Sequence, residues 1–284
     1  MKLTVVLPAF NEQDSIVEVI HKVQQTLLAE GAEYEIIVVD DASTDETGRL
    51  AAEAGARVIR NPENLGYGAS LRRGIAVAQH EYIVIADADG TYPVARIPEL
   101  VKPLDEGYDM VVGARYGRYY ENSLVKTISR WLFKRLSEFV VGRRIPDINS
   151  GFRGFRKTAL LPALPYTSAG FSFTTTITLI FFAQGLFVKY VPVEYFQRQG
   201  KSKVNYFRDS LRALQAICEV ILRFNPLKMF LLLSFFPLGM MLVCLVVAAA
   251  ADSGQALVLA ALSFLVATLI WGLGLLGFTI QRAS

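Results

Sequence analysis

Short apolar runs alternate with amphipathic stretches along the N-terminal part of the chain. The apolar runs are typical of buried parallel strands, and they cover residues 3–7, 35–39, 56–59 and 83–85. Between the first two runs, apolar residues recur at helical spacing from about Asp14 to Glu30, and Gly31 ends the expected helix. A further helix is expected before the fourth run, ending near Ala78. This alternation predicts an α/β domain whose parallel sheet is covered by helices on both faces.

The C-terminal part of the chain has a different pattern. No charged residue occurs from Met229 to Ala251, or from Ser253 to Gln281. A helix needs roughly 20 residues to cross a bilayer, so the two runs predict a transmembrane hairpin. The alternative is a helical hairpin buried in a soluble protein. Arg223, Lys228 and Arg282 flank the outer ends, whereas the short connection carries one acid, so the positive-inside rule places both ends in the cytoplasm.

A segment in the middle of the chain is basic and amphipathic. Residues 118–157 contain ten Lys or Arg against three Asp or Glu. Within it, an apolar stripe runs along a helix expected at about 122–142, while Lys126, Arg130 and Lys134 recur on another face at four-residue spacing. The pattern is typical of a helix lying in a membrane interface, and residues 206–226 repeat it. Ordinary surface helices packed on the sheet are the alternative. We do not expect nucleic acid as a partner, because the apolar stripe and the spans already supply a membrane.

Acidic residues follow two of the expected strands. Ligands of open α/β sheets bind beyond the carboxyl ends of the strands, so Asp41 is placed to accept hydrogen bonds from a base or ribose. Asp87 and Asp89 offer two hard oxygen ligands, which suit Mg²⁺ or Mn²⁺ and, through the metal, a diphosphate. The alternatives are a polar turn after the strand and capping of the next helix. Gly66 and Gly68 are interpreted as a tight turn that lets backbone pass near a nucleotide.

Several short motifs together carry a family resemblance. They are Pro8-Ala9-Phe10-Asn11-Glu12, Asp40-Asp41-Ala42-Ser43-Thr44-Asp45, Asn64-Leu65-Gly66-Tyr67-Gly68, Asp87-Ala88-Asp89, Val112-Gly113-Ala114-Arg115-Tyr116, Asp147-Ile148-Asn149-Ser150-Gly151-Phe152-Arg153 and Arg198-Gln199-Gly200-Lys201-Ser202-Lys203. The set resembles the family 2 glycosyltransferases of GT-A fold, a Rossmann-like fold that binds nucleotide-diphospho-sugars. Within them it is similar to the polyprenyl-phosphate glycosyltransferases, the group that contains dolichol-phosphate mannose synthase. The similarity spans residues 3 to about 230.

The resemblance implies a role for each matching residue. Nucleotide binding is implied for Pro8, Phe10 and Glu12, for Val39 and Asp41 at the base and ribose, and for Asp87, Ala88 and Asp89 at the diphosphate. The metal, Mg²⁺ or Mn²⁺, would be held by Asp87 and Asp89, with Thr91 at a position where relatives often carry Gln. Arg198 and Lys203 match a basic loop that closes over the diphosphate. The candidate catalytic residues are Asp89, Asp147, Arg115 and Arg130.

Asp147 has two alternative roles, and Arg130 is chosen for its position on the expected interfacial helix. Asp147 either orients the sugar or acceptor, or caps a loop. Arg130 is the candidate ligand of the acceptor phosphate, because an arginine on an interfacial helix can bond two oxygens of a phosphate at headgroup depth. Relatives also often carry an acid after a G-F-x-F motif, here Gly170-Phe171-Ser172-Phe173, where this chain has Thr174, Thr175 and Thr176. The donor sugar and base are therefore left open.

The expected protein is an integral protein of the cell or inner membrane. Its GT-A catalytic domain (residues 1–205) would be cytoplasmic, followed by a juxtamembrane interfacial helix (206–226) and two transmembrane helices (227–284). We expect inverting transfer of a sugar from GDP-mannose or a UDP-sugar to polyprenyl phosphate, dolichyl or undecaprenyl. A processive polysaccharide synthase and a non-catalytic nucleotide-sugar-binding scaffold are the alternatives. The synthases carry a Q-x-x-R-W motif, whereas Thr127 stands where that Gln would be. A homo-oligomer is left open.

Overall fold

The computed structural model describes residues 1–117, 124–197 and 206–283. The chain divides into two compact units, Met1–Ala216 and Ile217–Ser284.

The first unit is built on a seven-stranded sheet with the order β3-β2-β1-β4-β6-β5-β7. The strands are β1 (Lys2–Ala9), β2 (Glu33–Asp40), β3 (Arg57–Arg60), β4 (Tyr82–Ile85), β5 (Met110–Tyr116), β6 (Arg153–Arg156) and β7 (Val188–Glu194). The first four strands run parallel, as predicted, and β7 runs parallel to β5. The expectation of a parallel sheet is wrong at β6, which is antiparallel to both β4 and β5. Its sequence, Arg-Gly-Phe-Arg, lacks the apolar run that marks the other central strands.

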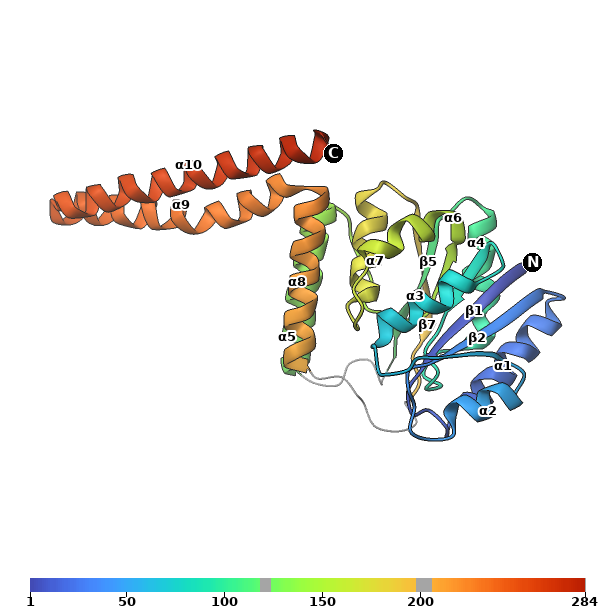
Figure 1. The fold of residues 1–284 in the computed structure, drawn as a ribbon. Helices are drawn as coiled ribbons and strands as arrows, with labels where there is room; N and C mark the ends of the chain where they lie inside the picture. The colour runs from blue at the N-terminus through green and yellow to red at the C-terminus, as the bar shows by residue number, and fades with distance from the viewer. Residues whose placement is uncertain (118–123, 198–205, 284) are drawn as a thin grey trace. The chain divides into compact units, whose positions relative to one another are not determined.

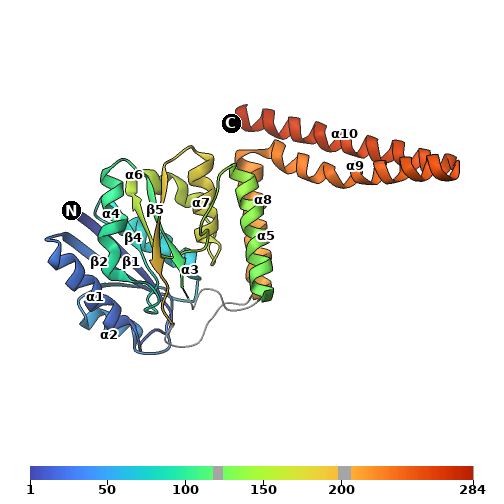
Figure 2. The same cartoon turned by 180° about the vertical axis from the view of Figure 1, so that it is seen from behind.

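Helices flank both faces of this sheet (Figure 1 and Figure 2). They are α1 (Ile16–Ala29), α2 (Thr47–Glu53), α3 (Tyr67–Val77), α4 (Ile97–Asp105), α6 (Lys157–Leu160) and α7 (Phe173–Ala183), with 3₁₀ turns η1 (Val94–Arg96) and η2 (Leu161–Tyr166). Helix α5 (Leu124–Val141) packs on α7, and α8 (Tyr206–Phe224) contains the boundary between the two units. Successive side chains of a strand point to opposite faces. Along β1, Leu3, Val5 and Leu7 therefore join the core under α1 and α4, whereas Val6 lies against Gly74 of α3. Both faces are buried, which explains the uninterrupted apolar runs.

Helix α5 (Leu124–Val141) lies within the segment where an amphipathic helix was expected, at about 122–142. Ser137 and Val140 are buried, whereas Trp131 and Phe139 are 56% and 43% exposed, and the helix packs on α7. One face thus belongs to the first unit, and the other presents large aromatic side chains to the surroundings.

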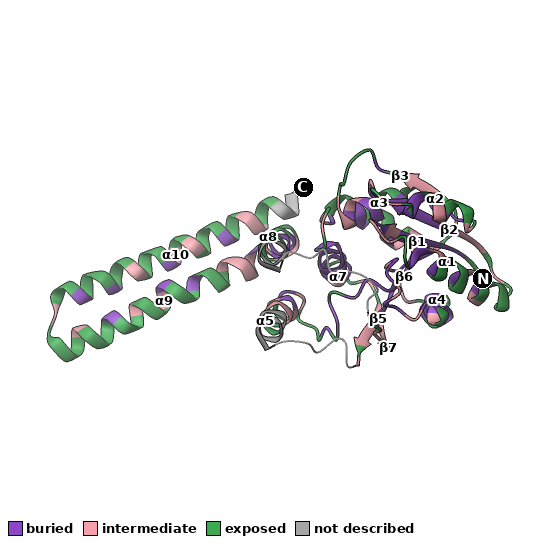
Figure 3. Ribbon diagram, turned by 90° about the horizontal axis from the view of Figure 1, so that it is seen from below, coloured by how far each residue is buried: buried purple, intermediate pink, exposed green. Residues whose placement is uncertain are grey.

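The second unit contains the hairpin of α9 (Pro226–Ala251) and α10 (Gly254–Ala283). Both helices are long and apolar enough to cross a membrane, and 17% of the most apolar window of each is buried. Most of their apolar surface is therefore exposed (Figure 3), which does not fit a hairpin buried in a soluble protein. Asp252 ends α9 in the left-handed conformation, with φ of 46°. The helices approach closely at Gly274, where an added Cβ would lie 2.8 Å from Phe230 Cβ.

Candidate active site

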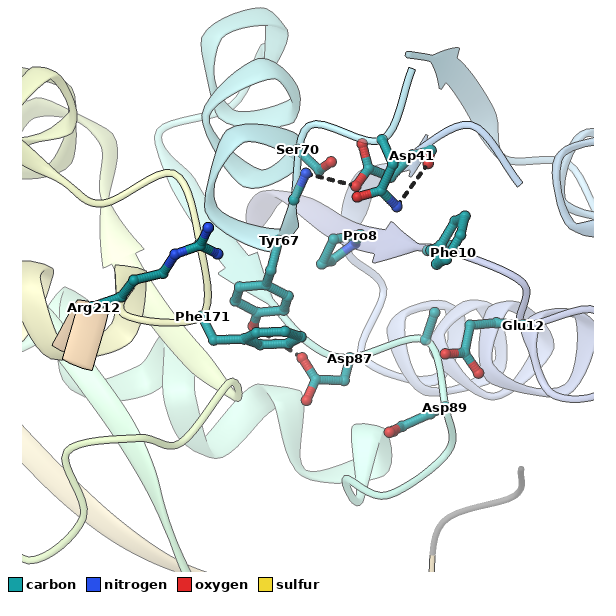
Figure 4. A pocket seen from close by; sticks show the side chains of 15 residues that line it. Pro8, Phe10, Glu12, Asp41, Tyr67, Ser70, Asp87, Asp89, Phe171 and Arg212 are labelled. Carbon is teal, nitrogen blue, oxygen red and sulfur yellow. Dashed lines mark hydrogen bonds between the residues drawn. The ribbon is translucent and has the colours of Figure 1, made fainter. Parts of the chain in front are cut away.

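A pocket of about 270 Å³ lies beyond the carboxyl ends of β1, β2 and β4, which are neighbours in the sheet (Figure 4). Most of its lining residues come from these strand ends and from the starts of α3 and α7. They are Pro8, Ala9, Phe10, Glu12, Asp41, Asn64, Gly66, Tyr67, Ser70, Asp87, Ala88, Asp89, Gly170, Phe171 and Arg212. The structure thus brings together residues of four separate motifs. Val39, Thr91, Arg115 and Asp147 do not line the pocket; the side chain of Val39 is fully buried and lies against Gly74 of α3.

The turn after β1 is fixed by the loop that follows β2. Asn11 adopts a positive φ of 51°, and its backbone N–H donates to Ser43 Oγ at 3.0 Å. The next N–H, that of Glu12, donates to Thr47 Oγ1 at 2.8 Å. Burial alone would raise the pKa of Asp45, but hydrogen bonds from the Thr47 hydroxyl and N–H hold it below its usual value. These contacts position Phe10 and Glu12 at the edge of the pocket.

Asp41 holds the opposite wall together. Its Oδ1 accepts from the N–H of Leu65 at 2.9 Å and from Asn61 Nδ2 at 2.5 Å, and its Oδ2 accepts from the N–H of Gly66 at 2.8 Å. Asn61 is fully buried and also donates to Ser70 Oγ at 3.1 Å. The carboxylate predicted to bind base or ribose therefore shapes the loop that carries Asn64 and Gly66.

The two carboxylates after β4 are each bonded by a hydroxyl. Tyr67 Oη donates to Asp87 Oδ1 at 2.9 Å, and Thr91 Oγ1 donates to Asp89 Oδ1 at 2.6 Å. Burial, and then the Asp87 charge, raise the pKa of Tyr67 well above its usual value, so its hydroxyl keeps its proton. Thr91 is fully buried and does not line the pocket. Thr91 thus contacts the Asp89 carboxylate, and its direct contact with a metal stays a prediction.

The two glycines after Asn64 have different roles. Gly66 lines the pocket with φ of 95°, a conformation that side chains disfavour. At Gly68, an added Cβ would lie 2.2 Å from the carbonyl oxygen of Ser168. The backbone that passes Gly68 is thus the 168–170 loop, which also accepts the Ala69 N–H at the Ala169 carbonyl, 2.8 Å away. Gly66 therefore lines the pocket, whereas Gly68 allows the 168–170 loop to approach; that the turn passes near a nucleotide stays a prediction.

Comparison with known proteins identifies the family. Residues 4–161, more than half of the chain, match the family described as Glycosyl transferase family 2. The chain belongs to this family. An undecaprenyl-phosphate 4-deoxy-4-formamido-L-arabinose transferase from Klebsiella pneumoniae is 28% identical over 99% of this chain and 88% of its own length. Glycosyltransferase AglJ from Haloferax volcanii is 29% identical, over 71% of this chain and 65% of that protein.

Solved structures agree with the fold. Glucosyl-3-phosphoglycerate synthase from Mycobacterium tuberculosis, in complex with Mn²⁺, UDP-glucose and phosphoglyceric acid, superposes with a TM-score of 0.64 at 22% identity, covering 77% of this chain and 79% of that one. The expected GT-A α/β domain with two C-terminal apolar helices is confirmed. Membership of a glycosyltransferase family also sets aside the non-catalytic scaffold.

In this family 2 glycosyltransferase, Asp147 forms a buried ion pair with Arg115. Arg115 Nε donates to Asp147 Oδ2 at 2.7 Å, and Nη2 donates to Oδ1 at 3.0 Å. The Arg115 and Asn149 N–H groups donate to the same carboxylate. Burial alone would raise the pKa of Asp147, but the Arg115 charge and these hydrogen bonds hold it below its usual value. Of the two alternatives for Asp147, these contacts favour a role in fixing its loop.

Arg153, which the sequence argument left without a role, holds the same loop from inside the sheet. Its guanidinium is fully buried. It donates to the carbonyl oxygens of Ser150 and Ile148 at 2.7 and 2.8 Å, and to Thr178 Oγ1 at 2.6 Å. The loop between α5 and β6 is therefore anchored by two arginines.

The remaining predicted cations are only partly described. Arg198 and Lys203 lie outside the described residues. Arg130 belongs to α5, but its side chain is outside the described part of the chain. Among the described lining residues, the only cation is Arg212 of α8, which the sequence argument missed. Asn61 and Tyr67 were also missed as site residues, although Tyr67 stands within the N-L-G-Y-G motif.

The donor set around Asp87 fits a divalent metal that binds together with its substrate. No group of three His, Cys, Asp or Glu residues in the described ranges could hold a metal ion. Mg²⁺ is commonly bound by one or two carboxylates plus substrate phosphates and water. Asp87 and Asp89 supply that number of carboxylates at the pocket. The residues present therefore fit Mg²⁺ or Mn²⁺ bound with a diphosphate.

Proposed function

We propose that this protein moves a sugar from a nucleotide-sugar, GDP-mannose or a UDP-sugar, onto polyprenyl phosphate at the cytoplasmic face of a membrane, with inversion at the anomeric carbon. The observation that carries the proposal is the pair Asp87 and Asp89 at a pocket formed by three strand ends. The same chain carries two helices long and apolar enough to cross a bilayer. A lipid acceptor explains why the carboxylate-containing pocket and the two apolar helices occur in one chain.

The relatives support the lipid acceptor. The Klebsiella pneumoniae transferase is named for undecaprenyl phosphate, and its similarity to this chain extends through the apolar helices, covering 99% of the chain. Solved neighbours hold UDP-glucose with Mn²⁺, or UDP with Mg²⁺, which supports a nucleotide-sugar donor and a divalent metal.

The proposed reaction follows from the charges at the pocket. An oxygen of the lipid phosphate attacks the anomeric carbon and forms the new C–O bond. The bond to the nucleoside diphosphate breaks, and its electron pair leaves with the diphosphate. The lipid phosphate is ionised at neutral pH, so no general base is required. Asp87 and Asp89 would hold the metal, which when bound stabilises the charge on the departing diphosphate.

Cations of this chain would complete the charge balance. Arg212 lines the described pocket, and Arg198 and Lys203 are proposed to bind the departing diphosphate. Arg130, on a helix with exposed aromatic residues, is proposed to bind the acceptor phosphate. A guanidinium suits both partners because it can donate two parallel hydrogen bonds to a phosphate.

The test is a transfer assay with membranes that contain the full chain. Radiolabelled GDP- and UDP-sugars are offered with undecaprenyl or dolichyl phosphate, with and without EDTA. We expect label in the lipid fraction with one donor, loss of label with EDTA, and recovery when Mg²⁺ or Mn²⁺ is added in excess. Equal transfer to a soluble alcohol would contradict the lipid acceptor. For the orientation, a Ser253→Cys variant should react with an impermeant thiol reagent from the non-cytoplasmic side.

A further inference from the structure

Asp87 accepts a hydrogen bond from a residue far from it in the sequence, and Asp89 accepts two from a residue of its own turn. Asp89 Oδ1 accepts from the N–H and hydroxyl of Thr91, two residues later. Asp87 Oδ1 accepts from the hydroxyl of Tyr67, at the first position of α3 and twenty residues away. The orientation of Asp87 therefore depends on where α3 begins.

The surroundings of Asp87 leave little room for another orientation. A Cβ added at Gly151 would lie 2.7 Å from Asp87 Oδ1, 3.0 Å from Asp87 Oδ2 and 2.8 Å from Tyr67 Oη. The backbone N–H of Gly151 in turn donates to Tyr92 Oη at 2.8 Å. The carboxylate thus packs against a fixed backbone on one side and accepts the tyrosine hydroxyl on another.

Tyr67 is itself held by the loop before α7. Its ring stacks on Phe171 with 5.7 Å between centroids and 19° between planes, and both rings line the pocket beside Asp87 (Figure 4). The close packing of Gly68 against Ser168, described above, ties the start of α3 to that same loop. Phe171 is 45% exposed, so the stack borders the open side of the pocket.

We propose that Tyr67 is a positioning residue that sets the orientation of the Asp87 carboxylate toward the metal–diphosphate, and that stacking on Phe171 holds Tyr67 in place. This inference rests on the proposed function. The Tyr67 hydrogen bond orients the Asp87 carboxylate, and the stack on Phe171 makes that orientation depend on the loop before α7. Hydrogen-bond partners of metal ligands typically change metal affinity by about 10- to 100-fold when they are removed.

The direct test is Mn²⁺ binding to the full-length protein in detergent, measured by the EPR signal of free Mn²⁺ with saturating UDP or GDP. Tyr67→Phe removes the hydroxyl and keeps the ring. We expect it to weaken Mn²⁺ binding by about 10-fold or more. Phe171→Leu keeps the hydroxyl and removes the stack, so a smaller loss is expected. The matched control is Tyr82→Phe, because the Tyr82 hydroxyl also donates to a carboxylate, that of Asp105, on the exposed surface.

The outcomes separate the inference from the function beneath it. Asp87→Asn should weaken Mn²⁺ binding in the same assay; if it binds Mn²⁺ as the wild type does, the metal assignment itself fails. If Asp87→Asn loses Mn²⁺ but Tyr67→Phe does not, the positioning role is overturned and the metal site stands. A fall in Tm for Tyr67→Phe well beyond that of Tyr82→Phe would also overturn it, because a general loss of structure would then explain the weaker binding.

Discussion

Around the pocket that contains Asp87 and Asp89, side-chain hydrogen bonds join residues that are far apart in the sequence, whereas along the α9–α10 hairpin the contacts come from small and apolar side chains. The Asp41 carboxylate, for example, accepts hydrogen bonds from Asn61, Leu65 and Gly66. On the hairpin, Gly274 faces Phe230, and the described polar side chains mostly bond within their own helix, as Thr268 does to the Leu265 carbonyl. Directional contacts define the pocket, and close packing defines the hairpin. The two regions should therefore respond to different kinds of substitution.

The largest effect is expected from the metal-site carboxylate. Asp89→Ala removes a charged oxygen ligand, and the electrostatic stabilisation by a metal is worth several kcal/mol, so transfer should fall by about a thousandfold or more. Lipid-linked product formation measures this, with Asp105→Ala as the control because Asp105 is an exposed acid outside the pocket. The fold of both variants is checked by thermal unfolding. Full activity of Asp89→Ala would remove the metal from the mechanism.

The next effect concerns Asp147 and tests stability. Asp147→Asn leaves the Arg115 guanidinium, with 14% of its side chain exposed, without its carboxylate, and breaking a buried pair typically costs about 3–5 kcal/mol. At about 2–4 °C per kcal/mol, the Tm should fall by roughly 10 °C. Glu99→Gln is the control, because the Arg96–Glu99 pair is exposed and such pairs contribute about 0–1 kcal/mol. An unchanged Tm with a lower kcat would instead indicate that Asp147 contacts the substrate.

The same pair gives a pH dependence whose sign is fixed. The folded protein holds the pKa of Asp147 below the ordinary value of 3.8. Its contribution to stability is therefore complete above about pH 4 and is lost as the pH falls through the folded-state value. The Tm difference between wild type and Asp147→Asn should shrink on acidification below pH 4. A difference that grows there would contradict the ion pair.

Periodic features of the sequence predicted the first half of the sheet and the hairpin. Strands β1 to β4, helix α5 and both hairpin helices follow from apolar spacing, because burial on one face, on both faces or in lipid each leaves its own pattern. Strands β5 and β7 were not predicted as strands. Strand β6 left no such pattern, since the buried Arg153 within it is satisfied by carbonyl and hydroxyl oxygens that only the folded chain supplies.

The candidate site divides in the same way. The motifs pointed to Phe10, Asp41 and the Asp87–Asp89 pair, because acids after apolar strands are visible in the sequence. The contacts of Tyr67 with Asp87 and of Asn61 with Asp41 join separate motifs through the fold. Such a contact cannot be inferred from the spacing of residues in the sequence, so Tyr67 and Asn61 were not predicted as supporting residues.

A smaller effect is expected where two loops meet at the pocket. In Gly68→Ala, the new methyl group would overlap the Ser168 carbonyl oxygen, and overpacking of this kind typically costs about 1–3 kcal/mol. The Tm should fall by a few degrees. Gly170 belongs to the loop that lies against Gly68, but in Gly170→Ala the new Cβ has no neighbour closer than 4.0 Å. The Gly170→Ala variant should therefore keep the wild-type Tm. Equal Tm values for the two variants would mean that the loops do not need their close approach.

The smallest effect is expected in the hairpin, and two neighbouring glycines of α10 isolate it. Alanine is favoured over glycine inside a helix by about 1 kcal/mol, so substitution at either position includes the same gain. At Gly272 an added Cβ meets nothing within 4 Å, whereas at Gly274 it would lie 2.8 Å from Phe230 Cβ. That Cβ is anchored to the α9 backbone, so Gly274→Ala must push the helices apart, and small residues are what allow membrane helices to approach closely. We expect Gly274→Ala to unfold in detergent at a Tm a few degrees below that of Gly272→Ala. If both variants match the wild type, the hairpin does not depend on close packing at this point.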